Sequence, residues 1–345
     1  MKKYFPLLLC FYIVTSCKKF ESCESIFNTK KIPLVTRIAF GSCGSQNDEQ
    51  PILNTIISKN SNLFIYLGDN IYGDTKIMPE LEHEYFKLCS KSEFQHLITS
   101  TRVLATWDDH DYGENDSGKN YSKKEASKNI FLKFWGEPFG SQRWYRPGIY
   151  TSYFFGDTSH LVQIILLDCR TFRDDLRIDA FGNYLQNNDP NVTMLGADQW
   201  RWLKTELQKP AKLRIIASST QLLREYNGME SWANYPKEQQ KMLNLIQETQ
   251  VKNLFFISGD VHLAELSKVS INNNTQDIYD FTSSGFTASK IQDVDIANSN
   301  RVGNSVYQQT NFGTIDIDWN QQPLKVTFKV INQAGEEKFN YSVFY

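Results

Sequence analysis

Six short apolar runs in this chain each end abruptly at polar side chains that can bind metal or phosphate. They end in Phe-Gly-Ser-Cys at Cys43, Tyr-Leu-Gly-Asp-Asn at Asp69, Ala-Thr-Trp-Asp-Asp-His at Asp109 and His110, Leu-Leu-Asp-Cys-Arg at Asp168 and Arg170, Ala-Ser-Ser-Thr-Gln at Gln221, and Ser-Gly-Asp-Val-His at Asp260 and His262. Buried strands of α/β proteins are continuous apolar runs, and ligands bind just beyond their carboxyl ends. The runs therefore predict one pocket built from residues that are far apart in the sequence.

The composition is that of a globular chain with a substantial core. Of the 345 residues, 41% are hydrophobic and 14% aromatic, which suffices for one large α/β domain or two ordinary ones. The 37 lysines and arginines are balanced by 39 acidic residues, so the formal net charge is −2. Because this balance creates no global basic field, we expect no sequence-specific binding of nucleic acid, and any recognition of phosphate must be local.

The amino terminus predicts export. Lys2 and Lys3 precede an apolar stretch over residues 4–14, which is well short of the roughly 20 residues that a membrane-spanning helix needs. Small residues and Cys17 follow, and this pattern resembles a bacterial lipobox. It predicts a signal peptide over residues 1–16, a tether over residues 17–35 with a lipidated Cys17, and one continuous domain over residues 36–345. We expect an exported bacterial lipoprotein at the cell envelope, in the periplasm or at the cell surface, attached to the membrane through Cys17. An ordinary signal peptide cleaved elsewhere is the alternative.

The other cysteines do not suggest a disulfide framework. Cys23 lies in the predicted tether, Cys89 in an amphipathic stretch, and Cys169 at the end of an apolar run, and we interpret each as a buried or unreactive thiol. For Cys43, two interpretations stay open at this point, a small core residue or a metal ligand.

Hydrophobic periodicity predicts alternating strands and helices followed by a tail of strands. Strands are expected over residues 36–41, 63–67, 102–107, 150–155, 161–167, 213–218 and 254–258, and helices over 48–59, 80–97, 123–135, 197–207 and 236–248. Beyond Leu263 the helical pattern disappears, and residues 278–282, 313–318, 324–330 and 339–344 are expected to form antiparallel strands. This order predicts one α/β domain with a β-rich C-terminal tail.

The chemistry of the predicted pocket indicates metal. It would hold carboxylates from five aspartates together with a thiol, a phenol and two imidazoles: Asp69, Asp108, Asp109, Asp168 and Asp260, with Cys43, Tyr72, His110 and His262. So many carboxylates would repel one another unless cations neutralised them. A thiolate and a phenolate favour a ferric or zinc-like ion, whereas carboxylates and amides suit calcium, magnesium or manganese. The chain has only five histidines, which disfavours an all-histidine zinc site.

Five motifs along the chain resemble those of a known family. They are Phe40-Gly41-Ser42-Cys43, Gly68-Asp69-Asn70-Ile71-Tyr72, Thr106-Trp107-Asp108-Asp109-His110-Asp111, Leu167-Asp168-Cys169-Arg170 and Gly259-Asp260-Val261-His262. In this order they resemble the alkaline phosphatase D family, a branch of the calcineurin-like metallophosphoesterases that is related to the purple acid phosphatases. The resemblance covers about residues 36–265 and is specific in combination, although no single motif would be. It implies a metallophosphoesterase-like βαβ sandwich of two mixed sheets flanked by helices.

The resemblance also implies a multinuclear metal site and a reaction. Asp69 would bridge the ions, and Cys43, Tyr72 and Asp260 would help to hold a ferric ion. The remaining matched positions are Asp109, where many relatives have the Asn of a Gly-Asn-His motif, His110 after it, His262 as a final ligand or acid, and Asn115 as a further metal or phosphate contact. Members are described as iron and calcium enzymes that hydrolyse phosphodiesters and phosphomonoesters. Zinc, manganese and magnesium are the other metals that such a site can take.

Two departures from the family pattern bear on this inference. Better-known members carry a sizeable β-rich amino-terminal domain, whereas here only a short tether precedes the first motif. The acidic motif also continues as Asp111-Tyr112-Gly113-Glu114-Asn115-Asp116-Ser117-Gly118, with a different spacing of asparagine and acidic residues. The second divergence concerns the surroundings of the metals and the substrate preference.

The expected mechanism is attack of a metal-bound hydroxide on the phosphorus of a phosphate ester. His110 is the candidate for stabilising the developing charge or protonating the leaving oxygen. Arg170 lies two residues after Asp168, so strand alternation predicts both on one face of the pocket. We assign both to catalysis, with Arg170 as a bidentate phosphate clamp, and an ion pair between the two is the alternative.

Two other functions compete with this hypothesis. A metal-independent hydrolase of the glycosidase type would use Asp108 or Asp109 with Asp168 as paired carboxylates. It leaves Cys43, Tyr72 and the Gly-Asp-Val-His motif without a role. The third possibility is a noncatalytic surface-binding protein on the same scaffold.

Overall fold

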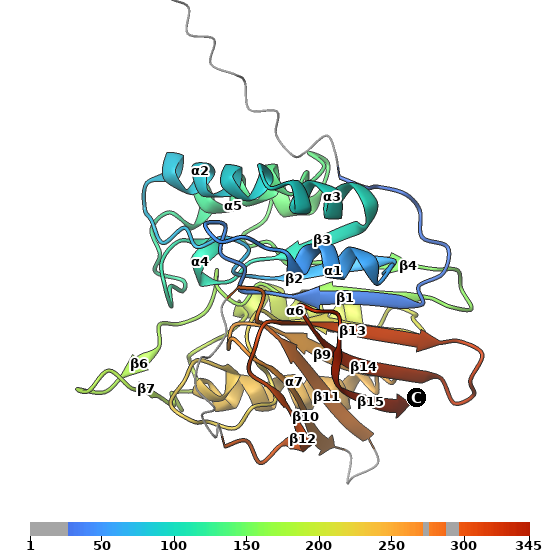
Figure 1. Cartoon of the computed structure of the whole chain (residues 1–345). Helices are drawn as coiled ribbons and strands as arrows, with labels where there is room; N and C mark the ends of the chain where they lie inside the picture. The colour runs from blue at the N-terminus through green and yellow to red at the C-terminus, as the bar shows by residue number, and fades with distance from the viewer. Residues whose placement is uncertain (1–26, 272–275, 288–296) are drawn as a thin grey trace, which may run out of the picture.

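Two β-sheets stack face to face, and helices cover both of their outer faces (Figure 1). The computed structural model describes residues 27–271, 276–287 and 297–345. The predicted signal peptide and Cys17 lie outside the described residues. The first sheet has six strands in the order β15 (Glu337–Phe344), β14 (Lys325–Asn332), β13 (Asn311–Asp318), β1 (Arg37–Gly41), β2 (Leu63–Leu67) and β3 (Arg102–Thr106).

The second sheet has seven strands and receives contributions from the middle and the end of the chain. Their order is β12 (Arg301–Tyr307), β10 (Ala264–Ile271), β11 (Gln276–Ser283), β9 (Leu254–Ser258), β8 (Leu213–Ala217), β5 (Val162–Leu166) and β4 (Thr151–Phe155). Both sheets are mixed, because β1, β2 and β3 run parallel, as do β5, β8, β9 and β11, while the remaining pairs are antiparallel.

Helices pack on the outer faces and short segments connect them. On the first sheet lie α1 (Ile52–Ser58), α2 (Met78–Cys89), α3 (Ser92–Ser100) and α5 (Lys124–Phe134), and on the second lie α6 (Gly196–Leu207) and α7 (Pro236–Thr249). The shorter elements are α4 (Asp109–Tyr112), η2 (Gln142–Trp144), η3 (Trp232–Asn234) and a hairpin of β6 (Arg177–Ile178) and β7 (Tyr184–Leu185). None of the helices within the described residues is both long and apolar enough to cross a membrane.

Strand β2 shows how the sequence produces these layers. All of its residues are buried, so its apolar run is unbroken. Leu63, Ile65 and Leu67 point between the two sheets, whereas Phe64 and Tyr66 point toward the helices. The alternation of side chains across a strand thus feeds one core between the sheets and another beneath the helices.

Most predicted elements are present, and the differences have local causes. The helix expected over 80–97 is two helices, separated at Ser90 and Lys91, where the extended backbone of Lys91 begins α3. The helix expected from residue 48 begins at Ile52, after Pro51 at its N-cap. The tail is not wholly antiparallel, because β11 joins the second sheet parallel to β9.

One cysteine interpretation was wrong. Cys89, at the end of α2, is disulfide-bonded. Cys43 and Cys169 are free and buried thiols. Periodicity places Cys89 on a helix but carries no information on which cysteine approaches it.

Candidate metal centre

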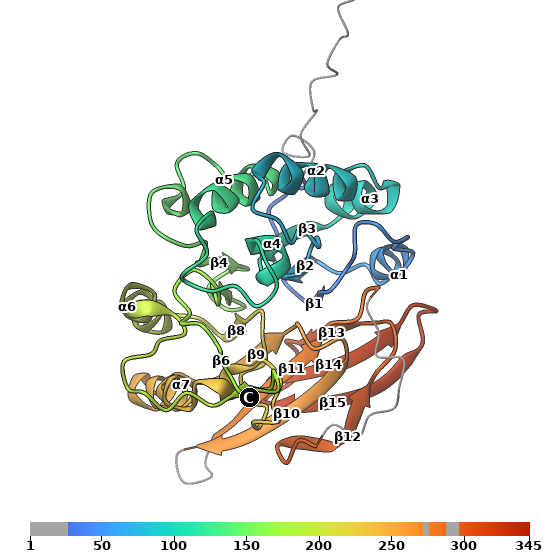
Figure 2. The same ribbon diagram turned by 90° about the vertical axis from the view of Figure 1, so that its left-hand side faces the viewer.

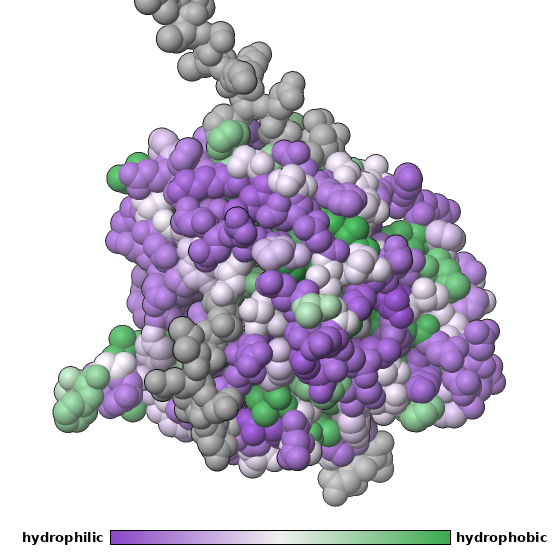
Figure 3. Space-filling view, viewed as in Figure 1, coloured by the Kyte–Doolittle hydropathy of each residue, from purple (hydrophilic) through white to green (hydrophobic). Residues whose placement is uncertain are grey.

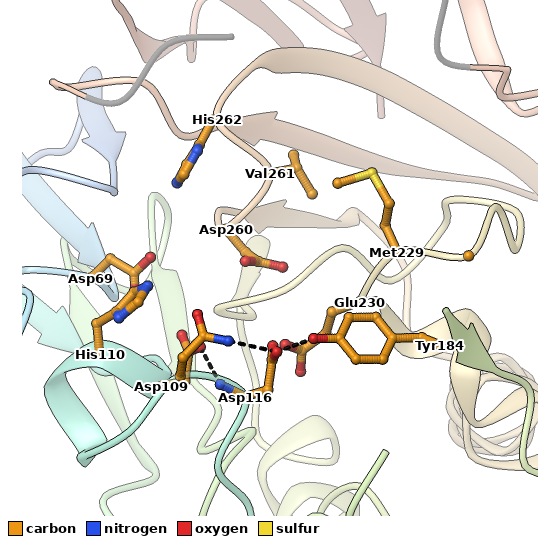
Figure 4. A pocket seen from close by; sticks show the side chains of 12 residues that line it. Asp69, Asp109, His110, Asp116, Tyr184, Met229, Glu230, Asp260, Val261 and His262 are labelled. Carbon is orange, nitrogen blue, oxygen red and sulfur yellow. Dashed lines mark hydrogen bonds between the residues drawn. The ribbon is translucent and has the colours of Figure 1, made fainter. Parts of the chain in front are cut away.

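The predicted ligands gather at one edge of the sandwich because parallel strands end together. Cys43 follows β1 and Asp69 follows β2, and the aligned strand β3 is followed by Asp108 and Asp109. From the second sheet, the segment after β9 brings Asp260 within reach of Asp69. The pocket has a volume of about 280 Å³ and is lined by Asp69, Asp109, His110, Asn115, Asp116, Tyr184, Gly228, Met229, Glu230, Asp260, Val261 and His262 (Figure 4).

Four of the predicted metal ligands have a left-handed backbone. The φ angles are 59° at Cys43, 48° at Asp69, 74° at Asp260 and 57° at His262. Such a conformation costs a residue other than glycine on the order of 1 kcal/mol or more, and it persists only where the surrounding structure enforces it. Strain concentrated in the segments after β1, β2 and β9 is typical of a functional site.

Gly68 allows two of these segments to approach each other. Its φ is +105°, and a Cβ built there would lie 2.5 Å from Asp108 Cβ and 2.6 Å from Asp108 N. No side chain fits at this distance, so only glycine lets Asp69 and Asp108 meet across the ends of β2 and β3. Asp111 fastens the same junction, since its carboxylate accepts hydrogen bonds from Asn70 N and Asp108 N, each at 3.0 Å.

A Gly68→Ala substitution is expected to weaken metal binding by about tenfold or more, because it pushes the loops that carry these aspartates apart. It should also lower the melting temperature by several degrees. Gly335→Ala is the matched control, because Gly335 has a φ of +86° but only ordinary contacts from 3.5 Å. Calorimetric metal titration of both variants checks the prediction, and equal affinities would contradict it.

One group of donors is soft. Donor atoms of Cys43, Asp69 and His262 all lie within 4.8 Å of one another. Cys43 Sγ lies 3.4 Å from Asp69 Oδ2, and the Tyr72 hydroxyl lies 3.4 Å from His262 Nε2. Thiol, phenol, imidazole and carboxylate together are the donors expected for a ferric or zinc-like ion.

The second group of donors is mostly carboxylate oxygen. Asp69, Asp108 and Asp260 form one set of converging donors, and Asp69, Asp109 and His110 form another. Within the described part of the chain, the buried atoms Asp69 Oδ1, Asp108 Oδ2 and Asp109 Oδ1 have no hydrogen-bond partner. Buried carboxylate oxygens are rarely left unsatisfied, so the residues present fit cations in this space. Asp69 belongs to the soft group and to both of these sets, so cations held there would share it.

Electrostatics support the same conclusion. Burial raises the pKa of Asp69 well above its usual range, and repulsion from Asp109, Asp108, Asp111 and Asp260 raises it further. Burial and the neighbouring carboxylates likewise raise the pKa of Asp260. A pocket of this kind holds protons or cations rather than bare charges, and bound cations would keep the aspartates ionised.

His110 is oriented by a carboxylate. Its Nδ1 lies 2.7 Å and 2.8 Å from the two carboxylate oxygens of Asp74, and its ring lies against Tyr72 with centroids 4.3 Å apart. Burial lowers the pKa of His110, but the hydrogen bond with Asp74 and the charge of Asp109 outweigh burial, so the net shift is upward. This pairing fixes the imidazole so that its other nitrogen is available to the pocket.

Asp168 lies outside the pocket. Both oxygens of this fully buried carboxylate are occupied, accepting hydrogen bonds from Trp107 Nε1 at 3.0 Å, Arg170 N at 3.0 Å, Thr171 N at 2.9 Å, Thr171 Oγ1 at 2.7 Å and Ile149 N at 2.9 Å. It therefore neither faces substrate nor forms a glycosidase-type pair with Asp108 or Asp109. The contacts give it a structural role, because it joins Trp107, Ile149, Arg170 and Thr171 within the fold.

Arg170 also differs from expectation. It is fully buried, and its side chain is turned toward Asp108 with Nε at 2.5 Å and toward Glu230 with Nη1 at 2.8 Å, while Nη2 lies 3.5 Å from Asp109. Neither a phosphate clamp nor a side-chain ion pair with Asp168 fits these contacts. Instead, Arg170 holds Asp108 and Asp109 from behind the pocket.

Several site residues escaped the sequence analysis. Glu230 lines the pocket between Arg170 and Arg173, which outweigh its burial and lower its pKa. Asp116 donates its N–H to Asp109 Oδ2 at 2.6 Å and accepts a hydrogen bond from Tyr184. One sequence feature could have identified Glu230, namely its position in a polar loop beyond the predicted strand over 213–218. Asn115, predicted as a further metal or phosphate contact, lies in the pocket lining, where its Nδ2 donates to Asp116 Oδ2 at 2.6 Å.

The fold is found in solved structures. It matches the structure of PhoD with a TM-score of 0.68 at 17% identity, covering 90% of this chain and 72% of that chain. It matches GAP50, described as the anchor in the inner membrane complex of Plasmodium, with a TM-score of 0.57 at 17% identity over 91% of this chain and 89% of that one. It also matches a dimetal phosphatase from Danio rerio with a TM-score of 0.54 at 11% identity, covering 90% of this chain and 99% of that chain. The molecule therefore has the metallophosphoesterase fold predicted from the motifs.

The family follows from the sequence. A family model described as PhoD-like phosphatase matches residues 14–328, and the chain belongs to this family. Alkaline phosphatase D of Bacillus subtilis (strain 168) is 24% identical over 193 residues, which are 49% of this chain and 32% of that protein. The chain thus matches about a third of this relative's length. The predicted membership of the alkaline phosphatase D family is confirmed.

Proposed function

We propose that the protein hydrolyses phosphate esters at a centre that holds at least two cations. The observation that carries the proposal is the place of Asp69 in both donor groups, next to buried carboxylate oxygens that have no hydrogen-bond partner. Iron at the soft group, with Cys43, Asp69, Tyr72 and His262, and calcium among the aspartates are the metals that the donors favour. When bound, such cations neutralise phosphate oxygens and supply an activated water.

The protein's own residues orient the reaction. The pocket opens above Asp69, Asp109 and Asp260, so an ester phosphate is drawn to this acidic floor only when cations are present. His110 faces the same space and can give a proton to the leaving oxygen, while Asp74 holds its imidazole. Arg170 keeps Asp108 and Asp109 in position from below.

Hydrolysis of bis-4-nitrophenyl phosphate and 4-nitrophenyl phosphate by the purified protein tests the proposal. We expect the protein to release 4-nitrophenol from these esters. Chelation of the metals should abolish this release, and iron and calcium together should restore it. Preference for the first substrate would define a phosphodiesterase and preference for the second a phosphomonoesterase. Turnover that survives exhaustive chelation, or no turnover by metal-loaded protein, would contradict the proposal.

Replacing Asp74 with asparagine tests the role of His110. We expect kcat to fall by about 10²-fold with a methyl ester and by much less with a 4-nitrophenyl ester, because only the poor leaving group needs a proton. Metal content is measured in parallel, because Asp74 orients His110 and His110 belongs to one of the donor sets. Asp157→Asn is the matched control, since Asp157 also pairs with a histidine, His160, at 3.0 Å, but outside the pocket lining. Equal losses with both esters would contradict this role.

Export and lipidation are proposed from the sequence alone. A bacterial lipoprotein attached through Cys17 would present this pocket to phosphate esters of the cell envelope. Incorporation of labelled palmitate into the protein, and its loss in a Cys17→Ser variant, would support this localisation. An unlabelled protein recovered free from membranes would contradict it.

A further inference from the structure

The hairpin formed by residues 177–185, here called the arm, projects from the molecule beside the pocket (Figure 1). Figure 2 shows the arm on the same side of the molecule as α4, which begins at Asp109. Tyr184 belongs to the arm and to the pocket, because it lies in β7 and lines the pocket. Ile178 pairs directly with Tyr184 across the hairpin, so both side chains stand on the same face of the ribbon.

The end of the arm is apolar and exposed. Phe181 is 90% exposed and Ile178 is 58% exposed. The space-filling view shows hydrophobic atoms at the projecting end, where Figure 1 places the arm (Figure 3). Single exposed apolar residues are common on proteins, but Ile178 lies directly opposite Tyr184 of the pocket lining, and Phe181 is in the turn between them.

The turn that presents Phe181 is held by local hydrogen bonds. Asp179 Oδ1 accepts from Phe181 N at 2.8 Å and from Asn183 N at 2.9 Å, and Asp179 Oδ2 accepts from Asn183 Nδ2 at 2.9 Å. The one carboxylate of the turn is thereby occupied within the turn. At the base, Tyr226 donates its hydroxyl to the Tyr184 carbonyl at 2.5 Å and ties the arm to the loop that carries Met229.

The pocket itself has two unlike sides. Asp69, His110 and His262 lie on one side, while Met229 and the ring of Tyr184 lie toward the other, with Asp116 and Glu230 beside the Tyr184 hydroxyl (Figure 4). Phe181 lies three residues before Tyr184, in the turn at the projecting end of the arm. A phosphate at the metal donors would therefore place an attached alkyl chain against Tyr184 and then along Ile178 toward Phe181.

We propose that the arm binds the apolar part of the substrate, so that the preferred substrates are phosphodiesters of a long-chain or similarly apolar alcohol. This inference rests on the proposed function. Water would form the new bond to phosphorus while the bond to the leaving alcohol breaks, and the alkyl phosphate would leave the arm as product. Tyr184, Ile178 and Phe181 determine which ester is preferred and take no part in the bond changes.

The test compares 4-nitrophenyl ethyl, hexyl and decyl phosphates at concentrations where none forms micelles. With the unmodified protein we expect kcat/KM to rise by about tenfold or more from ethyl to decyl, because added methylenes become buried. An Ile178→Ser/Phe181→Ser variant should lose this rise, so that its kcat/KM differs little between the ethyl and decyl esters. A Phe181→Leu variant that keeps Ile178 should retain most of the rise in kcat/KM with chain length, because leucine is also apolar.

Phe139→Ser is the matched control, because Phe139 is 79% exposed but lies away from the pocket lining. It should keep the full dependence on chain length. Rates independent of chain length in the unmodified protein, or an undiminished rise in the arm variant, would overturn this inference and leave the proposed function standing. Absence of metal-dependent hydrolysis of every ester would overturn both.

Discussion

Replacing Asp69 with asparagine is expected to remove metal and turnover together. Asp69 contributes to the soft donor group and to two further sets of converging donors, so one substitution weakens three of the candidate sites, and only the set of Asp109, Asp116 and Glu230 lacks it among the described residues. Loss of an outer partner of a metal ligand typically costs 10–100-fold in affinity or activity, and a bridging ligand should cost at least about 10²-fold. Elemental analysis of the purified variant and its kcat/KM on bis-4-nitrophenyl phosphate measure the two effects. The fold should persist, because asparagine has nearly the same shape and removes a charge that burial disfavours.

An exposed aspartate supplies the control for this prediction. Asp198 in α6 has a side chain that is 63% exposed, and Asp198→Asn should leave metal content and rate unchanged. An Asp69→Asn protein with full metal content and full activity would show that the ions bind elsewhere. A variant with full metal content but no activity would point to a role for Asp69 toward substrate instead of metal.

Replacing Asp168 with asparagine is expected to destabilise the protein severely. The carboxylate accepts five hydrogen bonds from Trp107, Ile149, Arg170 and Thr171, and an amide would turn its NH₂ group toward several of these donors. Breaking a buried, fully satisfied charged group typically costs ~3–5 kcal/mol, so we expect the free energy of unfolding to fall by about that amount. Denaturant unfolding followed by tryptophan fluorescence measures it directly, because Trp107 is one of the partners.

Thr171→Val is the matched comparison for Asp168. It removes a single donor at 2.7 Å from Asp168 Oδ2 and should cost only about 1 kcal/mol. In both variants, the folded fraction should retain its metal and its kcat. A stable Asp168→Asn protein that binds metal yet has lost turnover would instead support the catalytic role inferred from the sequence.

The sequence was most informative where strand ends and function coincide. The run over 63–67 is buried throughout and followed by Asp69, so the polar residue necessarily lies beyond the strand at the sheet edge. Because β1, β2 and β3 are parallel, their ends had to meet, and the convergence of Cys43, Asp69 and Asp109 could be predicted without knowing the register.

Other features depended on contacts that periodicity does not encode. Strand alternation was expected to put Asp168 and Arg170 on one face, yet both follow β5, where the chain folds back so that Asp168 Oδ1 accepts from Arg170 N. Glu230 enters the site only through Arg170 and Arg173, which are about 60 residues away in sequence. The strands of the arm contain two residues each, too few for an alternating pattern to be detected.

The most direct test of the account is anomalous diffraction from crystals of the metal-loaded protein, with data collected on both sides of the iron absorption edge. We predict one iron peak enclosed by Cys43, Asp69 and His262, and a second cation without an iron signal among Asp69, Asp108 and Asp260. Asp69 should lie within bonding distance of both ions. A single ion that does not contact Asp69, or no ordered metal at this strand edge in a crystal of active protein, would contradict the central claim.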